Sequence, residues 1–574
     1  MLGKRLAQRG LFEADHLYLD LVGRDTFYGF LAAERGRLFR DEEFAALYCA
    51  DNGRASVPPS LLATALLLQT HDGVSDDEAK ARADFDLRWK VALGVAIEER
   101  PFAKSTLQLF RAQLILHERV RAVFRKSLDF ARQTGYFRGR KVKAAPDTSY
   151  ILGRGAVKDT YNLLADGIVK LARALAERDA TPPAAWAAAR ALSRYFGSSL
   201  KGEAAIDWDD PAARRELLAG VVADADRLLE MARAALAGLP PDDPARARLK
   251  GESELLAQLL LQDIERGAGG VALREGVAPD RVPSAHDPEM RHGRKSARKR
   301  FDGHKGAIAV DPDSQLILSA AVLPGNAQDR EGALDLVEQA EEDAGAEVEE
   351  AIGDCAYGDG DTRRAFADAG RGLVAKVPQR RDRAYFPKDD FRIDLGAMTC
   401  VCPRGHECRT VVPIGARKRY GDIPLRAFRF DAALCDACPS RPACVRARPG
   451  QGRTVVIHPE EALLQEARAL QRSPAFAPYR RLRQAAEHRL ARLMQLGVRQ
   501  ARYFGRAKTL FQLLLAATVA NLTLVATKTG RIRSRRREAH HAPLIFGPTP
   551  TLIPILRLSM PHQLGTRPVA AARG

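Results

Sequence analysis

The segment FDGHKGAIAVDPDSQLILSAAVLPG, residues 301–325, contains two apolar runs joined by the turn-forming residues DPDS. Runs that alternate on either side of a short turn predict an antiparallel β-hairpin. Downstream, DREGALDLVEQAEEDAG (329–345) predicts a helix, VEEAI (348–352) a strand, and GLVAKVP (372–378) a further strand after another helix. The hairpin therefore begins a mixed α/β unit.

One more strand precedes the hairpin. The run KVKAAPDTSYI (141–151) predicts a strand with Asp147 at its end. From Thr160 to about Gly267 the pattern returns to helix, rich in Ala, Leu, Arg and Glu, with breaks at TPP and LPPDDP. Because strand character resumes afterwards, we interpret this helical block as an insertion.

The N-terminal residues, up to about 135, are predicted to be helical. The run PPSLLATALLLQT is an apolar segment opened by prolines, and Ser75 with Glu78 makes a capping-box pattern for a helix over residues 76–93. A third helix begins near Ser105 and runs through LQLFRAQLILHERVRAVFRKSL (107–128). Helix, turn and helix at this spacing is typical of DNA-binding domains and also of small helical bundles, so both interpretations stay open.

Three carboxylates lie far apart in the sequence, each in a context that suits a two-metal site. Asp147 and Asp354 follow short runs with β-branched residues and precede small or turn-forming residues. Glu487 lies on a predicted helix, where Tyr479, Arg483 and Glu487 follow one another at i+4 steps on one face. Phosphodiester chemistry uses carboxylates to hold a pair of divalent ions. The pattern therefore predicts metal-dependent phosphodiester chemistry.

Other acids compete for two of these positions. Asp159 competes with Asp147, which we prefer because its strand context is clearer, although a lone Asp after a strand is often a turn or cap residue. Asp359 and Asp361 compete with Asp354, but they are typical caps of the helix that follows them.

Composition and charge favour a polyanionic partner. The chain has 574 residues, 46% of them hydrophobic, which is enough for several cores. Its 90 Lys and Arg against 72 Asp and Glu give a net charge of +18, which a generally basic proteome would also produce. The charge is concentrated in residues 291–305 and 528–537. Each run is dense enough to neutralise several phosphates, although a solvated face is the ordinary interpretation of such a run.

No targeting or membrane segment is predicted. The N-terminus MLGKRLAQRGLFEADH lacks the apolar region of a signal peptide, so we expect a cytoplasmic, nucleoid-associated protein. The run TLFQLLLAATVANLTLVAT (509–527) approaches the length of a membrane span. It contains Gln512 and Asn521, and we interpret it as a buried helix packed on a sheet.

Six of the eight cysteines lie between residues 400 and 444. Cys435 and Cys438 have the two-residue spacing of a zinc knuckle, and a cytoplasmic chain would not keep these thiols as disulfides. The predicted ligands of a structural Zn²⁺ are Cys402, Cys435, Cys438 and Cys444, with Cys400, Cys408 and His406 as alternates. Reduced, unligated thiols are the alternative. Cys49 and Cys355 are isolated, and Cys355 is expected to be a small buried side chain.

The order of these elements matches the ribonuclease-H-like α/β fold, and the chain resembles the DDE transposases of bacterial insertion sequences. It is similar to the branch with an N-terminal helical domain and a cysteine-rich insert before the last acid. The resemblance covers about Val57 to Val525. It rests on PDTSYILGRGAVKDTYNLL, SAHDPEMRHGRKSARKRFDGHKG, LPGNAQDREG, GDCAYGD and the helix with Glu487.

The resemblance implies that Asp147, Asp354 and Glu487 bind Mg²⁺ or Mn²⁺, and hard oxygen ligands suit these ions. It implies that Arg483 contacts a phosphate near the scissile bond, whereas a weak i+4 salt bridge is the alternative. The implied partner is double-stranded DNA, both element ends and target. With this partner, the resemblance favours DNA contacts over a solvated face in the basic runs, at Arg291, Arg294, Lys295, Arg298, Lys299, Arg300, Lys305, Arg535 and Arg536. A homodimer or a higher oligomer is expected on DNA, because two ends must be brought together.

The sequence departs from the family at two places. Three residues instead of two separate Tyr479 from Arg483. Met494 occupies the usual lysine position, and Arg492 is a possible substitute for that lysine. In LPGNAQDREG, Asn326 and Asp329 either orient the site or form a turn and a helix cap.

The predicted fold class is α/β: a ribonuclease-H-like catalytic core with an N-terminal all-α domain, a helical insertion and a cysteine-rich β insertion. The expected function is a transposase that cuts and joins terminal inverted repeats by two-metal hydrolysis and strand transfer. The alternatives are a catalytically silent DNA-binding regulator and a ribonuclease-H-like nuclease without strand transfer. The expected boundaries are 1–135 for the N-terminal DNA-binding or assembly domain, 140–527 for the catalytic domain, 160–285 and 385–455 for its insertions, and 528–574 for a basic tail.

Overall fold

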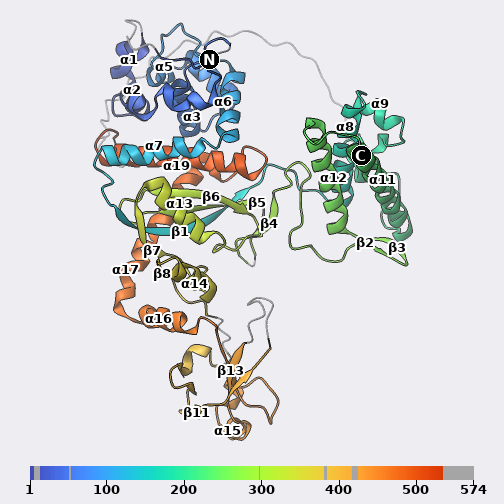
Figure 1. Ribbon diagram of the computed structural model, residues 1–574, viewed down its shortest axis with the longest axis vertical. Coiled ribbons are helices and arrows are strands. Elements are labelled where there is room, and N and C mark those ends of the chain that lie inside the picture. The colour runs from blue at the N-terminus through green and yellow to red at the C-terminus, as the bar shows by residue number, and fades with distance from the viewer. Residues whose placement is uncertain (6–12, 51–52, 297, 380–383, 416–424, 534–574) are drawn as a thin grey trace, which may run out of the picture. The chain divides into compact units, whose positions relative to one another are not determined.

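The computed structural model describes residues 1–5, 13–50, 53–296, 298–379, 384–415 and 425–533. A mixed sheet lies at its centre (Figure 1). Its strands are β1 (Lys141–Leu152), β4 (Arg291–Arg294), β5 (Arg300–Val310), β6 (Ile317–Pro324), β7 (Glu347–Ile352) and β8 (Gly372–Val374). Strand β5 is antiparallel to β1, β4 and β6, whereas β7 is parallel to β1 and to β8. The order β6-β5-β1-β7-β8 is consistent with a ribonuclease-H-like core.

The hairpin predicted from the sequence is present. Strands β5 and β6 pair from His304 opposite Pro324 to Val310 opposite Ile317, and Gln315 adopts a positive φ of 61° in the turn. Helix α13 (Ala333–Ala344) then leads from β6 to β7, and α14 (Gly360–Asp368) leads from β7 to β8. Parallel strands need such crossover helices. The predicted alternation of strands and helices downstream of the hairpin is therefore confirmed.

The N-terminal residues form helices, as predicted. These are α1 (Ala14–Val22), α2 (Phe27–Leu38), α3 (Pro59–Asp72), α4 (Asp76–Phe85), α5 (Leu87–Leu93), α6 (Lys104–Leu116) and α7 (Val120–Gln133), with a 3₁₀ segment η1 (Asp41–Leu47). The predicted capping box before α4 is present. The single helix expected over residues 76–93 is wrong, because Asp86 caps α5 by accepting a hydrogen bond from the Arg88 amide. The helix from Ser105 also ends early, where Glu118 has a φ of 52°.

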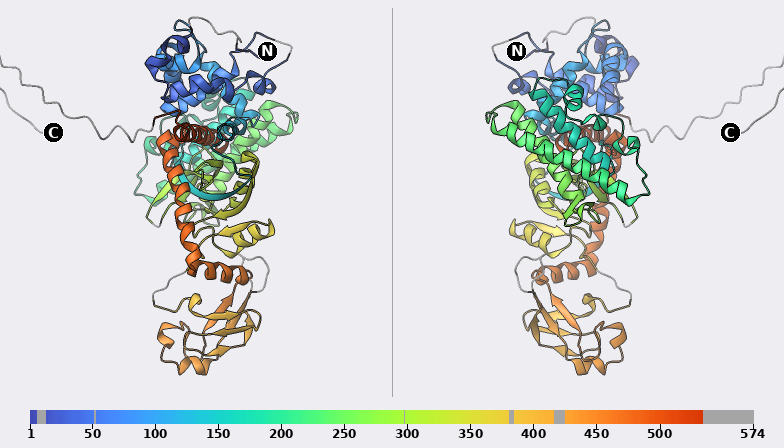
Figure 2. Two further views of the ribbon diagram at one scale, coloured as in Figure 1. Left: turned by 90° about the vertical axis from the view of Figure 1, so that its left-hand side faces the viewer. Right: turned by 90° about the vertical axis from the view of Figure 1, so that its right-hand side faces the viewer.

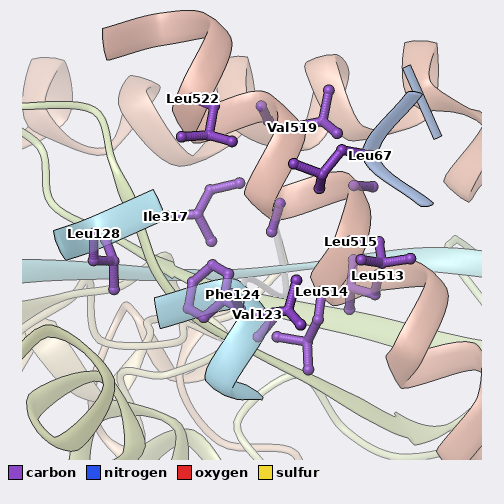
Figure 3. Packing of buried hydrophobic residues seen from close by; sticks show 14 of the residues in the cluster. Leu67, Val123, Phe124, Leu128, Ile317, Leu513, Leu514, Leu515, Val519 and Leu522 are labelled. Atoms are coloured by element: carbon purple, nitrogen blue, oxygen red, sulfur yellow. The ribbon is translucent and has the colours of Figure 1, made fainter. Parts of the chain in front are cut away.

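Helix α19 (Arg506–Lys528) lies in the main hydrophobic core. It packs against α3, α7 and β6, and Figure 3 shows its leucines beside Phe124 of α7 and Ile317 of β6. A buried polar side chain, Asn521, is satisfied because it bonds the Ile317 amide and carbonyl at 2.9 and 2.8 Å. By length and composition α19 could cross a membrane, but 83% of its apolar window is buried in the molecule. The prediction of a buried helix packed on the sheet is confirmed.

A second helical block follows β1 in the sequence and has a core of its own. Its helices are α8 (Thr160–Arg178), α9 (Pro183–Ala188), α10 (Leu200–Glu203), α11 (Pro211–Ala237) and α12 (Pro244–Asp263). The long helices α8, α11 and α12 pack side by side, in green in Figure 2. A small hairpin, β2 (Ile264–Gly267) and β3 (Gly270–Leu273), follows them. The sequence does not predict this hairpin, because such short strands show little alternation.

The segment between β8 and the last helices is cysteine-rich and forms two small antiparallel sheets. Its strands are β9 (Arg392–Asp394), β10 (Thr399–Val401), β11 (Glu407–Cys408), β12 (Val411–Pro413), β13 (Arg426–Arg429) and β14 (Thr454–Ile457). Its helices and those that follow are α15 (Ala432–Asp436), α16 (Glu461–Arg472), α17 (Ala477–Leu482) and α18 (Gln484–Leu493). Phe391, Phe428 and Phe430 pack with Cys400 in a small separate core.

Candidate active site

Two of the three predicted acids lie where parallel strands β1 and β7 separate. The last β1–β7 pair is Ala144 opposite Ala351, and beyond it β1 continues as the partner of β5 alone. Asp354 follows the end of β7 by two residues, and Asp147 lies opposite Ile308 of β5. The carboxyl ends of parallel strands commonly form ligand sites where neighbouring strands diverge.

The prediction that Asp147 ends its strand is wrong. Strand β1 runs on to Leu152, because pairing with β5 supports it after β7 has diverged. Pro146 fits this position, since its nitrogen has no proton and the β7 side of the strand is no longer paired.

Helix α18 brings the third acid to this place. Its buried side, which includes Ala486, Leu490 and Leu493, packs towards β1 and β5. The Glu487 side chain lies off that side and is half exposed. Asp147, Asp354 and Glu487 line one cavity of about 570 Å³. Three segments that are distant in the sequence therefore place carboxylates around a common space.

The charge of this carboxylate group is only partly balanced. Burial raises the pKa of Asp147 to about 6, and the negative charges of Asp354 and Glu487 add to the rise. The Thr148 amide donates to Asp147 Oδ1 at 2.8 Å, and the Ala356 amide donates to Asp354 Oδ1 at 2.7 Å. In the described part of the chain neither aspartate forms an ion pair with Lys or Arg. Such a site favours a bound cation.

Arg483 is the cation nearest to the third acid. Its Nη2 lies 2.5 Å from Glu487 Oε1, and Arg483 also lines the cavity. The geometry thus shows the i+4 salt bridge that was the alternative to phosphate contact, in a position that faces the same space as the acids. Both interpretations of Arg483 are compatible with this arrangement.

The donor set suits a hard divalent ion, because carboxylate oxygens are the ligands that Mg²⁺ and Mn²⁺ prefer. Within residues 1–533, outside the undescribed gaps, no three Asp, Glu, His or Cys side chains lie close enough together to hold a metal ion as they stand. The chemistry of the residues therefore fits a metal, while their side chains are not drawn together around one.

A partly buried network supports β1 beside the acids. Lys305 Nζ donates to Asp329 Oδ1 at 2.7 Å and to the Ala327 carbonyl at 2.5 Å, and Thr148 Oγ1 donates to the same Asp329 oxygen at 2.8 Å. Lys305 is only 9% exposed. It therefore lies inside the site and not on the solvated basic surface. Asp329 links the 326–332 loop to β1, whereas Asn326 bonds Pro279 outside the cavity.

The competing acids have structural roles. Asp159 caps α8 by accepting from the Tyr161 and Asn162 amides. Asp359 caps α14 and forms an ion pair with Arg330 at 2.6 Å. The caps explain why neither acid lines the cavity of the three carboxylates.

The family positions around α18 also have clear contacts. The Tyr479 hydroxyl donates to Glu350 at 3.1 Å, outside the acid cavity. Arg492 donates to Gln495, and Met494 lines the cavity at the usual lysine position. Tyr479 therefore has a contact with β7 and does not line the cavity of the three acids.

The basic run forms a hairpin beside the site. Strand β4 pairs with the first residues of β5, and Arg294, Lys295, Arg298, Lys299 and Arg300 are exposed there. Arg291 differs, because it is part-buried and donates to the Pro288 and Met290 carbonyls. The predicted contacts at Arg535 and Arg536 lie outside the described residues.

The lining of the cavity also includes three residues that the sequence analysis did not predict. Tyr150, Phe301 and Arg499 line it together with Arg294 and Lys295. They come from β1, β5 and the turn after α18, so no local spacing connects them. The only local signal is an aromatic residue three positions after Asp147 in the run PDTSY.

The four predicted zinc ligands lie around one narrow cavity of about 30 Å³, together with His406. Burial raises the pKa of the Cys444 thiol, and the neighbouring thiols Cys435, Cys402 and Cys438 add to the rise. The alternates Cys400 and Cys408 are buried, and Cys408 Sγ donates to the Arg429 carbonyl at 3.1 Å. As noted for the acids, the thiols in the described residues are not drawn together into a metal-binding group.

The expectation for Cys355 is wrong. It is exposed and lines a second, larger cavity of about 930 Å³, because it lies in the turn after β7 and not in the strand. Cys49 is also exposed.

Comparison with protein families adds two matches. Residues 401–526 match a family described as "Transposase DDE domain", and residues 24–113 match a "Transposase domain (DUF772)". The first match includes Glu487 and most of α19, and the second includes helices α2 to α5. No curated protein and no solved structure matches the chain. The two matches confirm the resemblance to the DDE transposases of insertion sequences that was drawn from the sequence.

Proposed function

We propose that this transposase cuts the terminal inverted repeats of an insertion sequence and joins them to target DNA. The single observation that carries the proposal is the convergence of Asp147, Asp354 and Glu487 on one cavity. The sheet order supports a ribonuclease-H-like core, into which the helical block and the cysteine-rich segment are inserted.

In this proposal the three acids hold Mg²⁺ or Mn²⁺. When bound, the ions supply an activated attacking oxygen and stabilise the leaving oxygen. Asp147 must be deprotonated to act as a ligand, and its raised pKa makes this step sensitive to pH. Arg483 faces the same cavity and can exchange Glu487 for a phosphate oxygen. Lys305 and Asp329 hold β1 in place.

Two reactions follow from this site. Water first attacks the phosphodiester at the element end, which breaks the P–O bond and releases a 3′ hydroxyl. That hydroxyl then attacks a phosphodiester of the target, and the target strand leaves with its own 3′ hydroxyl. Because both steps rely on positioning and electrostatics, they need no covalent enzyme intermediate.

The exposed cations of the β4–β5 hairpin support DNA as the partner. Within the described residues, Arg294, Lys295, Arg298, Lys299 and Arg300 form no ion pair with Asp or Glu. Unneutralised cations on one surface favour phosphate contacts and make binding dependent on salt. A homodimer on DNA belongs to the same proposal, since two element ends must be joined.

The test compares three activities on labelled element-end DNA with Mg²⁺: binding, cleavage and joining. Asp147→Asn, Asp354→Asn and Glu487→Gln should each abolish cleavage and leave binding intact. Asp159→Asn is the matched control, because that acid only caps α8. Cleavage without joining would favour a nuclease, and binding without cleavage by the wild type would favour a silent regulator.

We also propose a structural Zn²⁺ in the cysteine-rich segment, held by Cys402, Cys435, Cys438 and Cys444. The small core of this segment supports the idea, since a metal would add stability where little apolar surface is buried. Cys438→Ser should lower the zinc content and expose the segment to proteolysis. Cys355→Ser is the control and should change neither, because Cys355 is exposed outside this segment. Zinc-free protein purified under reducing conditions would contradict the proposal.

A further inference from the structure

One tyrosine of the acid cavity, Tyr150, is surrounded by cations. Three cations lie over the Tyr150 ring: Lys299 Nζ at 5.1 Å from its centroid, Lys295 Nζ at 5.6 Å and the Arg499 guanidinium carbon at 4.1 Å. Arg294 lines the same cavity. Cation–π contacts hold these groups on the ring without neutralising their charge.

These cations lack acidic partners. In the described part of the chain none of Arg294, Lys295, Lys299 and Arg499 forms an ion pair with Asp or Glu. Arg499 donates instead to the Tyr150 carbonyl at 3.4 Å. Like charges gathered without acids repel one another, so the group is stabilised when an anion binds between them.

The tyrosine ring is accessible and held in place. Tyr150 is partly exposed, whereas Phe301 is buried and lies 5.2 Å from it at an interplanar angle of 33°. Phe301 therefore supports the Tyr150 ring from β5. Aromatic faces within a positively charged groove are the arrangement that binds unpaired nucleotides, because every base can stack on such a ring.

The size and position of the cavity restrict what can reach this ring. A volume of about 570 Å³ is that of a small-ligand pocket, which is large enough to receive one or two nucleotides of a single strand. Tyr150 lies three residues after Asp147 on the same strand, which places the two α carbons about 10 Å apart. Because Tyr150 and the three acids line the same cavity, a strand whose phosphate the acids hold can also reach the ring.

We infer that Tyr150 stacks on an unpaired base of the DNA strand that the acids cleave, while Arg294, Lys295, Lys299 and Arg499 bind the phosphates on either side of that base. The inference rests on the proposed function, since it takes DNA as the substrate of this site. If Tyr150 stacks in this way, the DNA beside the scissile bond must be unpaired when it is bound. A base that stacks on the ring displaces the cations from the face of the ring, and the displaced cations then contact the neighbouring phosphates.

The test uses the full-length protein and two strands of equal charge: a thymidine strand of about twelve nucleotides, within the range of single-strand sites, and an abasic strand of the same length. Fluorescence anisotropy in EDTA measures both affinities without cleavage. Wild type should bind the thymidine strand about tenfold more tightly than the abasic strand, the effect of one stacked base. Tyr150→Phe should keep this preference, and Tyr150→Ala should lose it while binding the abasic strand as before.

Two controls separate the ring from charge and from folding. Lys299→Ala should weaken the binding of both strands by the same factor, because it removes a phosphate contact. Tyr479→Ala removes another tyrosine with a lysine over its ring, outside the cavity, and should leave the preference unchanged. An unchanged preference in Tyr150→Ala, or its loss in Tyr150→Phe, would overturn the inference.

Different results would contradict the proposed function and the stacking inference. Wild-type protein that shows the Tyr150-dependent preference but does not cleave element ends with Mg²⁺ would contradict the transposase activity and leave base stacking established. Protein that cleaves without any base preference would contradict the stacking and leave the transposase activity standing.

Discussion

Two cavities adjoin the turn after β7, and they differ in how their charges are balanced. In the larger one, of about 930 Å³, Arg330 pairs with Asp359 at 2.6 Å, Arg468 pairs with Asp389 at 2.8 Å, and Lys388 pairs with Glu461. In the smaller one, of about 570 Å³, Asp147 and Asp354 have no basic partner and the cations around Tyr150 have no acidic one, among the described residues. Carboxylates without a basic partner, and not size, therefore distinguish the candidate site.

The largest expected effect is on cleavage. Asp354→Asn should reduce the rate of cleavage of element ends by at least about 10³-fold, the order of magnitude for losing a main electrostatic contact in a reaction site. The corresponding change in the larger cavity, Asp359→Asn, should leave the rate within a few-fold, because Asp359 only caps α14 and pairs with Arg330. Single-turnover kinetics of both variants check this difference. Equal losses would remove the distinction between the two cavities.

The next effect is on stability in the absence of metal. Burial, with the charges of Asp354 and Glu487, raises the pKa of Asp147 to about 6. The contribution of protonated Asp147 to the free energy of unfolding is therefore fully present below about pH 4 and is lost as the pH rises through 6. Asp147→Asn should therefore stabilise the protein in EDTA at pH 8, by at most about 3 kcal/mol, and give no gain at pH 4. Chemical denaturation at the two pH values measures the change.

Asp359 should show the opposite sign. Burial alone would raise its pKa, but hydrogen bonds from Arg330 and Thr362 outweigh burial and lower the pKa of Asp359. Its contribution is present at neutral pH and is lost as the pH falls through the lowered pKa, so Asp359→Asn should destabilise the protein at pH 8. A stabilised Asp359 variant, or a destabilised Asp147 variant, would contradict the assigned charge balance.

The smallest effect is on DNA affinity. Lys295→Ala should weaken DNA binding several-fold at low salt and reduce the slope of log K against log salt by about 1, the signature of one lost phosphate contact. Lys388→Ala should leave affinity and slope unchanged, because Glu461 already neutralises Lys388. Binding isotherms across a salt series decide between these outcomes. An unchanged slope for Lys295→Ala would show that Lys295 does not contact a DNA phosphate.

Local patterns predicted much of the fold. The hairpin at residues 301–325 and the buried helix α19 depend on alternation, turn residues and apolar length, all of which a short window contains. The end of β1 could not be placed in this way, because β1 continues through non-local pairing with β5. The break at Asp86 was missed because its capping role is visible only when α5 is seen to begin there.

The candidate site divides in the same way. Asp354 and Glu487 stand out beside a strand end and on a helix face. Tyr150 and Arg499 do not, because they meet only when β1 and the turn after α18 pack together. The exposure of Cys355 was likewise beyond local pattern, since it depends on the direction of one turn.

The most direct measurement is anomalous diffraction from crystals of the protein grown with Mn²⁺. The account predicts manganese bound between the carboxylates of Asp147, Asp354 and Glu487, with Glu487 withdrawn from Arg483. It also predicts that the signal disappears in Asp354→Asn. Manganese bound only in the larger cavity, or no manganese at these three acids at saturating concentration, would contradict the account.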